Sequence, residues 1–476
     1  MTRDGLGLAA ILAATFMGQV DGFIVTVAAP SLQRDLPATF GQVQLVGAVY
    51  VLAAAAGLVT GGRLGDRFGR RRVFLAGVAV FTLASLVCGL APSPEVLIVA
   101  RFVQGAAAAA LIPQELALIR TIFLDETRRT RAMSLYGVAL GLGVIFGLAG
   151  GGLLVHWNLA DLGWRSAFLI NVPIGLAILA MGRLGIDEAR STTAPGLDLA
   201  GAALTAVALP ALLIPIILGP EHGAWIWTSA VVGVATVAVL ARQQRAMSTR
   251  GREPLFPPRV LTAPGLPTGL TAIMTFFGGN AGLFLVYTYY TQTGLNHDPL
   301  AAGLMFVPLG IGFVTGSAVS GNLATRIGPR LPAYGCAFLA LTLATHLAVV
   351  HTPVETQTVL LGVAIGLVGL AEGLVVSPLI GAIFNRVSPD DAGAVSGAAA
   401  TTTQFGLALG FAAVGSWYRL ILGTTPGAPT TLADHSRAYS AAIGVLIALA
   451  AITAMLCLQQ TRTPRMDRVH RVERQP

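Results

Sequence analysis

The feature that most constrains this chain is a series of long apolar runs that carry almost no charge. A helix that crosses a bilayer needs about 20 mainly apolar residues, and fourteen runs of suitable composition can be marked between charged or Pro- and Gly-rich segments. Only 11% of the residues are Asp, Glu, Lys or Arg, against about 25% in an ordinary soluble domain. The sequence therefore predicts an all-α integral membrane protein. The fourteen predicted spans lie near 6–29, 41–62, 73–91, 97–118, 133–155, 165–184, 198–218, 226–241, 265–290, 301–321, 333–350, 356–383, 396–417 and 439–458.

The distribution of positively charged residues predicts the orientation of these spans in the membrane. All 30 residues in the combined Lys and Arg count are Arg, and twenty-five of them fall on one side of the membrane if the N-terminus is cytoplasmic. Basic residues accumulate in cytoplasmic loops, and a missed or added span would reverse every later loop. We therefore predict an even number of spans, cytoplasmic N- and C-termini, and a multi-pass protein of the cell (cytoplasmic) membrane. The first apolar run is interpreted as a span and not as a cleaved signal peptide, because it is long and contains Gln19 and Asp21.

The absence of Lys and the placement of the cysteines exclude several kinds of site. A P-loop ATPase needs a Lys on the nucleotide phosphates, and a pyridoxal enzyme needs a Schiff-base Lys. The net charge of +8 comes from Arg between apolar runs and not from a basic tract with aromatics, so we expect no nucleic-acid partner. Cys88, Cys336 and Cys457 lie inside apolar runs without metal-ligand spacing, so we expect neither a metal site nor a disulfide framework.

One loop sequence occurs twice and predicts a duplicated architecture. Residues 61–72 read GGRLGDRFGRRR and residues 320–330 read SGNLATRIGPR, and a shift of 259 positions aligns Arg67 with Arg326 and Gly69 with Gly328. Duplicated halves with a site at their interface are a transporter architecture. The predicted domains are an N-terminal six-helix bundle (1–190), two linking transmembrane helices with a cytoplasmic loop (191–262), a C-terminal six-helix bundle (263–460) and a cytoplasmic tail (461–476).

Five motifs occur in order along the chain: DGFIVTVAAP at 21–30, GGRLGDRFGRRR at 61–72, RFVQG at 101–105, GVIFGLAGGG at 143–152 and WRSAFLINVPIG at 164–175. They resemble the motifs of the major facilitator superfamily, and within it those of the fourteen-helix drug:proton antiporters. In the fourth motif, Leu148 stands where the antiporters have Pro, so the sequence leaves open whether the helix bends there.

This resemblance implies the superfamily fold, with two six-helix halves and two extra linking helices, and a function in efflux. The expected protein is a proton-coupled antiporter that exports drug-like or antibiotic small molecules by alternating access. It is expected to use the proton gradient with no cofactor, to work as a monomer in the lipid bilayer, and not to be an enzyme. We expect a hydrophobic substrate, with a cationic one left open. An uptake symporter of the same fold is the alternative. A non-transporting membrane sensor or a membrane enzyme would need a signalling domain or a catalytic cluster, and the sequence contains neither.

Four charged residues inside the predicted spans are the candidates for proton coupling: Asp21, Arg101, Glu115 and Glu372. A charge at the centre of a span costs at least ~2.5–3.5 kcal/mol and is functional by default. We interpret Asp21 as a proton-titrating carboxylate, the alternative being a permanent structural ion pair. The resemblance implies a role in proton coupling for Arg101, against a purely structural tie. For Glu372 we favour a proton or cationic-substrate site over a neutral carboxyl hydrogen-bonded between helices.

Glu115 shares a helix face with Arg101 and Gln104, since 14 positions at 100° per residue bring it back to within about 40°. A polar stripe with small residues between suggests a cavity wall. The alternative is an interfacial Glu paired with Arg120.

The substrate cavity is expected to use polar and aromatic side chains from several spans. Aromatic rings with polar tips suit a wide drug pocket, and their faces can hold cations. Tyr289 and Tyr290 lie near the outer end of their span, so we interpret them as an interfacial belt. The predicted cavity residues are Gln19, Gln104, Asn280, Tyr287 and Glu372.

The first copy of the repeated loop is expected to act as a conformational latch. An acid at a helix end can meet an Arg or a helix N-terminus in one state of a transporter. The second copy has Thr325 where Asp66 would align, so the latch is expected to be one-sided; plain membrane-surface charge is the alternative. The expected latch residues are Gly62, Asp66, Arg67, Gly69, Arg70 and Arg71. In the fifth span, Gly143, Gly147 and Gly151 are expected to pack against another helix.

Overall fold

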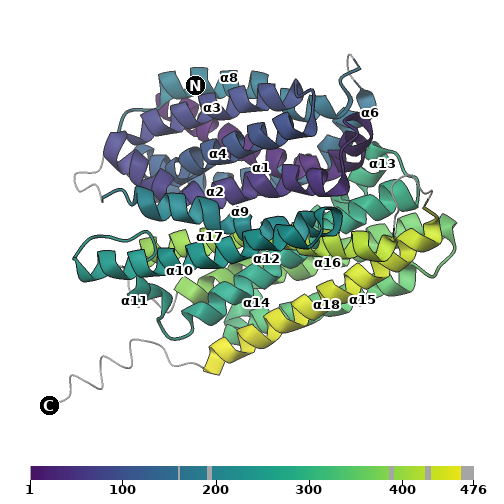
Figure 1. The fold of residues 1–476 in the computed structure, drawn as a ribbon. Helices are drawn as coiled ribbons and strands as arrows, with labels where there is room; N and C mark the ends of the chain where they lie inside the picture. The colour runs from purple at the N-terminus through teal and green to yellow at the C-terminus, as the bar shows by residue number, and fades with distance from the viewer. Residues whose placement is uncertain (1, 159–160, 190–195, 385–390, 424–429, 463–476) are drawn as a thin grey trace. The chain divides into compact units, whose positions relative to one another are not determined.

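The computed structural model describes residues 2–158, 161–189, 196–384, 391–423 and 430–462. All regular structure in these ranges is helical (Figure 1). Thirteen helical regions there are long and apolar enough to cross a membrane, and one of them, Pro299–Val349, contains two helices, Val307–Ile327 and Leu331–Val349. The prediction of fourteen spans is therefore confirmed. The predicted domain boundary at 190–191 and the tail beyond residue 462 lie outside the described residues.

The chain separates into two compact units. Unit 1 contains residues 1–243, 249–255 and 291–304, and unit 2 contains residues 244–248, 256–290 and 305–476. The helices of unit 1 are α1 (Arg3–Asp35), α2 (Phe40–Phe68), α3 (Arg70–Gly89), α4 (Pro94–Ile122), α5 (Glu126–Ile145), α6 (Gly151–Trp157), α7 (Ser166–Leu169), α8 (Asn171–Gly185), α9 (Leu199–His222), most of α10 (Thr228–Thr249) and α13 (Pro299–Leu304). Those of unit 2 are α11 (Pro258–Leu261), α12 (Leu266–Tyr289), α14 (Val307–Ile327), α15 (Leu331–Val349), α16 (Val354–Phe384), α17 (Ala392–Leu422) and α18 (Leu432–Arg462).

Polar residues between the apolar runs start several of these helices. Thr39 and Gln42 form a reciprocal capping box at the start of α2, with N–O distances of 3.1 and 2.9 Å. At the start of α5, Asp125 Oδ1 accepts a hydrogen bond from the backbone N–H of Arg128 at 2.8 Å. Such caps satisfy backbone donors that a helix leaves without a partner in its first turn. These helices therefore begin at polar residues that flank the apolar runs.

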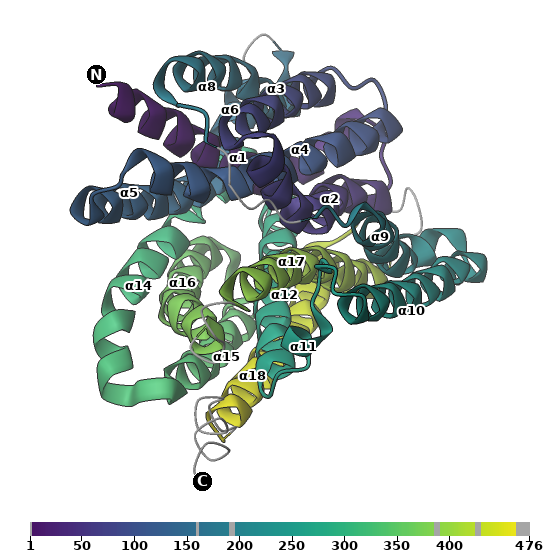
Figure 2. The same ribbon diagram turned by 90° about the vertical axis from the view of Figure 1, so that its left-hand side faces the viewer.

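The two units repeat the same packing order. In unit 1, α4 packs against α2 and α3, α1 packs against α5 and α8, and α8 also packs against α3 (Figure 2). In unit 2, α16 packs against α14 and α15, α12 packs against α17 and α18, and α18 also packs against α15. Each pair in one unit has its counterpart in the other. The predicted two six-helix halves are therefore present, and α9, from the extra segment, packs against α2.

Both copies of the repeated loop have a glycine with positive φ at the end of the preceding helix. Gly69 ends α2 with φ of 107°, and Gly328 ends α14 with φ of 72°. Glycine adopts positive φ without the steric penalty of a Cβ atom, which explains why the sequence repeat places Gly at both helix ends.

Glycines also bring the fifth span close to α1. A Cβ atom at Gly143 would lie 2.5 Å from the Cβ of Gln19, and one at Gly147 would lie 2.9 Å from the Cβ of Phe23, so α5 and α1 approach closely through Gly. Leu148 lies within a π-helical turn, Phe146–Gly150, between α5 and α6. A π-helical turn is one of the few features that interrupt a regular helix without proline. The question that the sequence left open is answered: the helix is irregular at this motif although the proline is absent.

Candidate functional site

A group of buried polar side chains surrounds Asp21 on α1. Its carboxylate has no exposed surface. Nη1 of Arg101, from α4, lies 2.5 Å from Asp21 Oδ2. The other carboxylate oxygen, Oδ1, accepts hydrogen bonds from Gln104 Nε2 and Asn171 Nδ2, each at 2.8 Å. Both oxygens of Asp21 thus have donors, and one donor is charged, which is the arrangement that a buried carboxylate needs.

Arg101 is held from several directions. Its Nε donates to the carbonyl oxygen of Val46 on α2 at 3.1 Å, and its Nη1 also donates to Gln104 Oε1 at 2.8 Å. The guanidinium carbon lies 4.1 Å from the ring centre of Tyr50 and 5.6 Å from that of Phe168. Among the described residues, Nη2 has no hydrogen-bond partner. The guanidinium therefore has other favourable contacts and a spare donor if its bond to Asp21 is lost.

Asp21, Arg101 and Gln104 were each predicted as site residues from the sequence, whereas Ser85 and Asn171 were not. Ser85 Oγ of α3 accepts from Gln104 Nε2 at 2.6 Å and from Asn171 Nδ2 at 3.3 Å. Asn171 lies inside the motif at 164–175, and an amide within an apolar span is the signal that could have identified it. The network thus joins α1, α3, α4 and α8, four of the six helices of the first half.

Glu115 lies in a separate polar group between α1, α4 and α5. Its Oε2 accepts hydrogen bonds from Thr15 Oγ1 at 2.9 Å and from Tyr136 OH at 3.1 Å. The side chain is buried, and within the described part of the chain Oε1 has no hydrogen-bond partner. The alternative of an interfacial Glu paired with Arg120 is wrong, because the partners of Glu115 are hydroxyl groups on two neighbouring helices.

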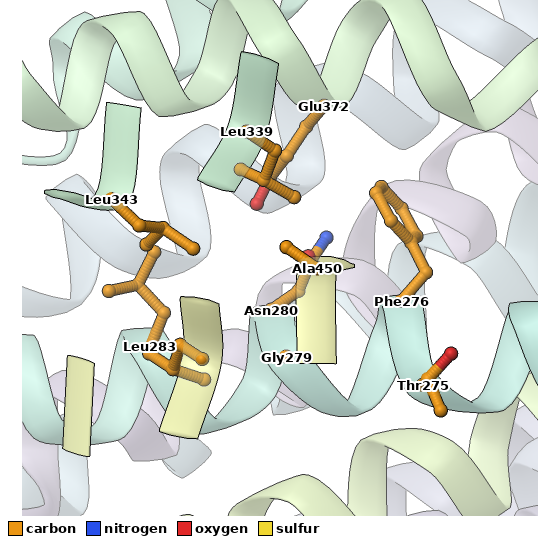
Figure 3. Close-up of a pocket in the computed structure, with 10 residues that line it drawn as sticks. Thr275, Phe276, Gly279, Asn280, Leu283, Leu339, Leu343, Glu372 and Ala450 are labelled. Atoms are coloured by element: carbon orange, nitrogen blue, oxygen red, sulfur yellow. The ribbon is translucent and has the colours of Figure 1, made fainter. Parts of the chain in front are cut away.

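In unit 2, Glu372 of α16 is buried and lines a small cavity (Figure 3). With the amide of Asn280 oriented so that its nitrogen faces the two nearby acceptors, it donates to Glu372 Oε1 and to the carbonyl oxygen of Phe276, each at 3.1 Å. The structure therefore brings together two of the predicted cavity residues, Asn280 and Glu372. The other lining residues are Thr275, Phe276, Gly279, Leu283, Leu339, Leu343, Leu446 and Ala450.

Tyr287 and Tyr289 of α12, and Tyr290 at the start of the π-helical turn that follows, lie elsewhere in unit 2. Tyr287 is not among the residues that line this cavity; it is buried with its ring centre 4.9 Å from that of Phe306 and 6.1 Å from that of His346. Tyr289 and Tyr290 are 5% and 0% exposed. Their interpretation as an interfacial belt is wrong, because a belt residue faces lipid headgroups. Rotation of the helix about its axis, which position along the chain does not reveal, turns both rings into the bundle.

Gln19 and the three glycines of the fifth span lie together where α1 and α5 pack. Gln19 is half-buried, with its Cβ against Gly143. Gly147 and Gly151 continue the same contact along α1, and a Cβ atom at Gly151 would lie 2.7 Å from Ile24 Cγ1. The glycines therefore serve close helix packing, as expected from their spacing.

At the junction of α2 and α3, Asp66 accepts hydrogen bonds from Arg70 Nη2 at 2.9 Å and Arg70 Nε at 3.3 Å. An acid at the end of one helix thus meets an Arg at the start of the next. Arg67 is exposed, and a Cβ atom at Gly62 would lie 3.6 Å from Pro113 Cβ on α4. In the second copy, Thr325 Oγ1 donates to the carbonyl oxygen of Asn322 at 2.7 Å.

Sequence analysis missed Glu188, which lies in the segment after α8 and contacts the start of α3. Its Oε1 accepts from the backbone N–H of Arg71 at 3.1 Å, and its Oε2 lies 3.5 Å from Arg72 Nε. Arg71 Nη2 donates to the carbonyl oxygen of Arg183 at 2.8 Å. A Cβ atom at Gly69 would clash with the Glu188 carboxylate. The positive end of a helix dipole favours an acid at this place, but a partner so distant in the sequence leaves no local signal.

The chain was compared with known proteins. Residues 11–411 match the family model described as Major Facilitator Superfamily. The chain is 36% identical over 487 residues to the puromycin resistance protein pur8 of Streptomyces alboniger, which covers 98% of this chain and 93% of that protein. It is also 36% identical over 470 residues to the cephamycin export protein CmcT of Amycolatopsis lactamdurans, with 96% and 93% covered.

Solved structures show a similar fold at low sequence identity. A bacterial homologue of the human lysosomal transporter Spinster, in an inward-facing and occupied conformation, matches with a TM-score of 0.71 and 16% identity over 96% of each chain. At this identity the likeness concerns the fold alone.

Proposed function

The chain belongs to the major facilitator superfamily, and we propose that it exports small, mainly apolar molecules across the cell membrane in exchange for protons. Its relatives include a puromycin resistance protein and a cephamycin export protein, which supports antibiotic-like substrates and the outward direction. Like them it is a multi-pass membrane transporter and not an enzyme. The observation that supports proton coupling is the buried Asp21–Arg101 pair, in which the carboxylate also accepts hydrogen bonds from two amide groups.

Proton uptake at Asp21 would change the contacts between four helices. A proton on the carboxylate removes its charge and weakens its bond to Arg101, while Gln104 and Asn171 keep an oxygen to donate to. Arg101 retains Val46, Gln104 and the face of Tyr50. The network therefore has a second arrangement, and a ligand or proton that favours one arrangement shifts the population toward it. This is what an alternating-access cycle needs at its coupling site.

Glu115 and the loop at Asp66 have separate proposed roles. Glu115 contacts hydroxyl groups on α1 and α5, so a change in its protonation would alter how these two helices are joined to α4. The contact of Asp66 with Arg70, and of Glu188 with the start of α3, supports a latch that fixes the junction of α2 and α3.

The remaining expectations concern energy source, substrate and assembly. We propose that the proton gradient replaces any cofactor, that Gln19, Asn280 and Tyr287 take part in substrate binding, and that one chain is a complete transporter. The amide of Gln104 is already bonded to Asp21 and Ser85, so we assign it to the proton network.

Transport in proteoliposomes tests this function. Purified protein is reconstituted, a pH gradient is imposed, and the movement of puromycin is measured for wild type, Asp21→Asn and Asp35→Asn. Asp35 is exposed at the end of the same helix and provides the matched control. We expect wild type and Asp35→Asn to move puromycin in the direction opposite to the proton flow. In Asp21→Asn, we expect the movement of puromycin to be independent of the pH gradient. Movement of puromycin together with protons would instead favour the uptake symporter, and movement independent of pH would exclude coupling.

A further inference from the structure

The carboxyl–amide contact in unit 2 has a counterpart in unit 1 on equivalent helices. In unit 1, the acid Asp21 is on α1 and the amide Gln104 is on α4. In unit 2, the amide Asn280 is on α12 and the acid Glu372 is on α16. The packing order makes α12 the counterpart of α1 and α16 the counterpart of α4. Each half therefore joins the same two helices through one carboxyl and one amide, with the acid on opposite partners.

The surroundings of Glu372 differ from those of Asp21. Asp21 has Arg101 at 2.5 Å, whereas none of the described residues that line the cavity of Glu372 is basic. The lining side chains of α15 and α18 are Leu and Ala, and α12 contributes only Thr275 and Asn280 as polar groups. His346 lies one turn beyond Leu343 on α15, with Nδ1 2.9 Å from Tyr439 OH. An ionised carboxylate is strongly unfavourable in such an apolar site, whereas a neutral acid with one amide partner is compatible with it.

The cavity is too small for a drug-like molecule in this conformation. The space open to the centre of a water-sized sphere is about 10 Å³, which is the room needed for a single water. Pockets for drug-sized ligands measure about 300–1,000 Å³. The glycines near Glu372 do not widen it, because Cβ atoms at Gly369 and Gly373 would clash with backbone atoms of α14. These glycines serve helix packing, so the site suits a proton and a water better than a substrate.

From this geometry we propose that Glu372 is a second proton-binding residue, acting separately from Asp21, so that each half of the transporter takes up one proton per cycle. The proposal rests on the proposed proton-coupled export. The proton leaves Glu372 only when the cavity opens to water, because the single bond from the Asn280 amide does not compensate for the charge of the carboxylate. Release of this proton is thereby tied to separation of α12 from α16.

Infrared spectroscopy tests the proton site without requiring transport. The full chain in liposomes is brought from acidic to alkaline pH, and the carbonyl stretch of protonated carboxyl groups is followed in the difference spectrum. We expect a band that Glu372→Gln lacks and that Asp21→Asn retains. Glu355→Gln, an exposed position on the same helix, is the matched control and keeps the band. Glu372→Asp, which retains a carboxyl, shifts the band without removing it. An unchanged band in Glu372→Gln overturns the proposal.

The limiting gradient of puromycin tests the coupling. With no membrane potential, each coupled proton multiplies the limiting concentration ratio about tenfold per unit of pH difference, since tenfold corresponds to about 1.4 kcal/mol. At a pH difference of one unit, Glu372→Gln should therefore reach a limiting puromycin concentration ratio about tenfold lower than that of wild type or Glu355→Gln. An equal ratio overturns the proposal. If wild type binds tetraphenylphosphonium and Glu372→Gln loses that binding, Glu372 is a cation site and the proposal is also wrong. If wild type does not transport at all, the infrared result still decides the proton site, while the proposed function fails.

Discussion

Removal of the charge from either partner of the Asp21–Arg101 pair should destabilise unit 1, and removal of both charges should cost much less than the sum of the two single losses. Asp21→Asn leaves a buried guanidinium without its counter-ion. Arg101→Gln leaves a buried carboxylate with only two amide donors. Both side chains have no exposed surface and their nearest atoms lie 2.5 Å apart. Breaking a fully buried ion pair in this way costs about 3–5 kcal/mol, chiefly because the remaining charge is uncompensated.

The double variant Asp21→Asn with Arg101→Gln contains no buried charge at this site. Its two amides can still bond to one another and to Gln104 and Asn171. We therefore expect it to be about as stable as either single variant, which corresponds to an interaction energy of about 3–5 kcal/mol in the double-mutant cycle. Of the two single changes, Arg101→Gln should be the more costly, because it also removes the hydrogen bond to Val46 and the contact with the ring of Tyr50.

Equilibrium unfolding in detergent micelles measures these values. Trp164 is buried, with its ring centre 6.0 Å from that of Phe168, which in turn lies beside Arg101. A protein that keeps Trp164 and has Phe at the other Trp positions therefore reports on this region by fluorescence. Asp35→Asn, at an exposed position of α1, is the control and should lie within about 0.5 kcal/mol of wild type. If the two single effects add to within about 0.5 kcal/mol in the double variant, the two side chains do not form an ion pair and the proposed coupling site is wrong.

Three further predictions use the same unfolding assay with matched positions. Gly143→Ala should cost about 1–3 kcal/mol through overpacking against Gln19, whereas Gly141→Ala, with nothing within 4 Å of its added Cβ, should be neutral or stabilising; equal effects would contradict the α1–α5 contact. Gly69→Ala should cost more than Gly328→Ala, since both have positive φ but only Gly69 has the Glu188 carboxylate against it. The excess should disappear in a Glu188→Ala background, and its persistence would be evidence against that contact. Glu115→Gln should cost no more than about 1 kcal/mol because its partners are hydroxyl groups, and a cost as large as that of Asp21→Asn would mean that Glu115 has a cationic partner.

The network around Asp21 shows which residues of the site can be predicted from the sequence and which cannot. Asp21 and Arg101 stand out because charge inside a span is expensive, and Gln104 follows because it is one turn from Arg101 on the same helix. Asn171 and Ser85 were missed although each is two hydrogen bonds or fewer from Asp21. They are uncharged, and their distance from Asp21 along the chain hides the contact.

Glu188, Tyr289 and Tyr290 show the same limit. Glu188 is an ordinary acid in a loop, and only the return of the chain after α8 places it at the start of α3. Tyr289 and Tyr290 have the sequence position of belt residues but are buried. A span can turn about its own axis without any change in its length or composition, so periodicity alone does not fix which neighbours a side chain contacts.

The sequence by itself determined the class, the fourteen spans, the duplicated halves and the family, because bilayer thickness and the cost of buried charge act on each segment separately. The preference for positive φ at Gly69 and Gly328 is likewise a local property. The tertiary structure decided which partners the intramembrane acids have: Arg101 and two amides for Asp21, two hydroxyl groups for Glu115, and one amide in an apolar cavity for Glu372. These differences arise from the rotation of each helix and from its close approach to others at glycine contacts. They distinguish three carboxyl groups that look alike in the sequence.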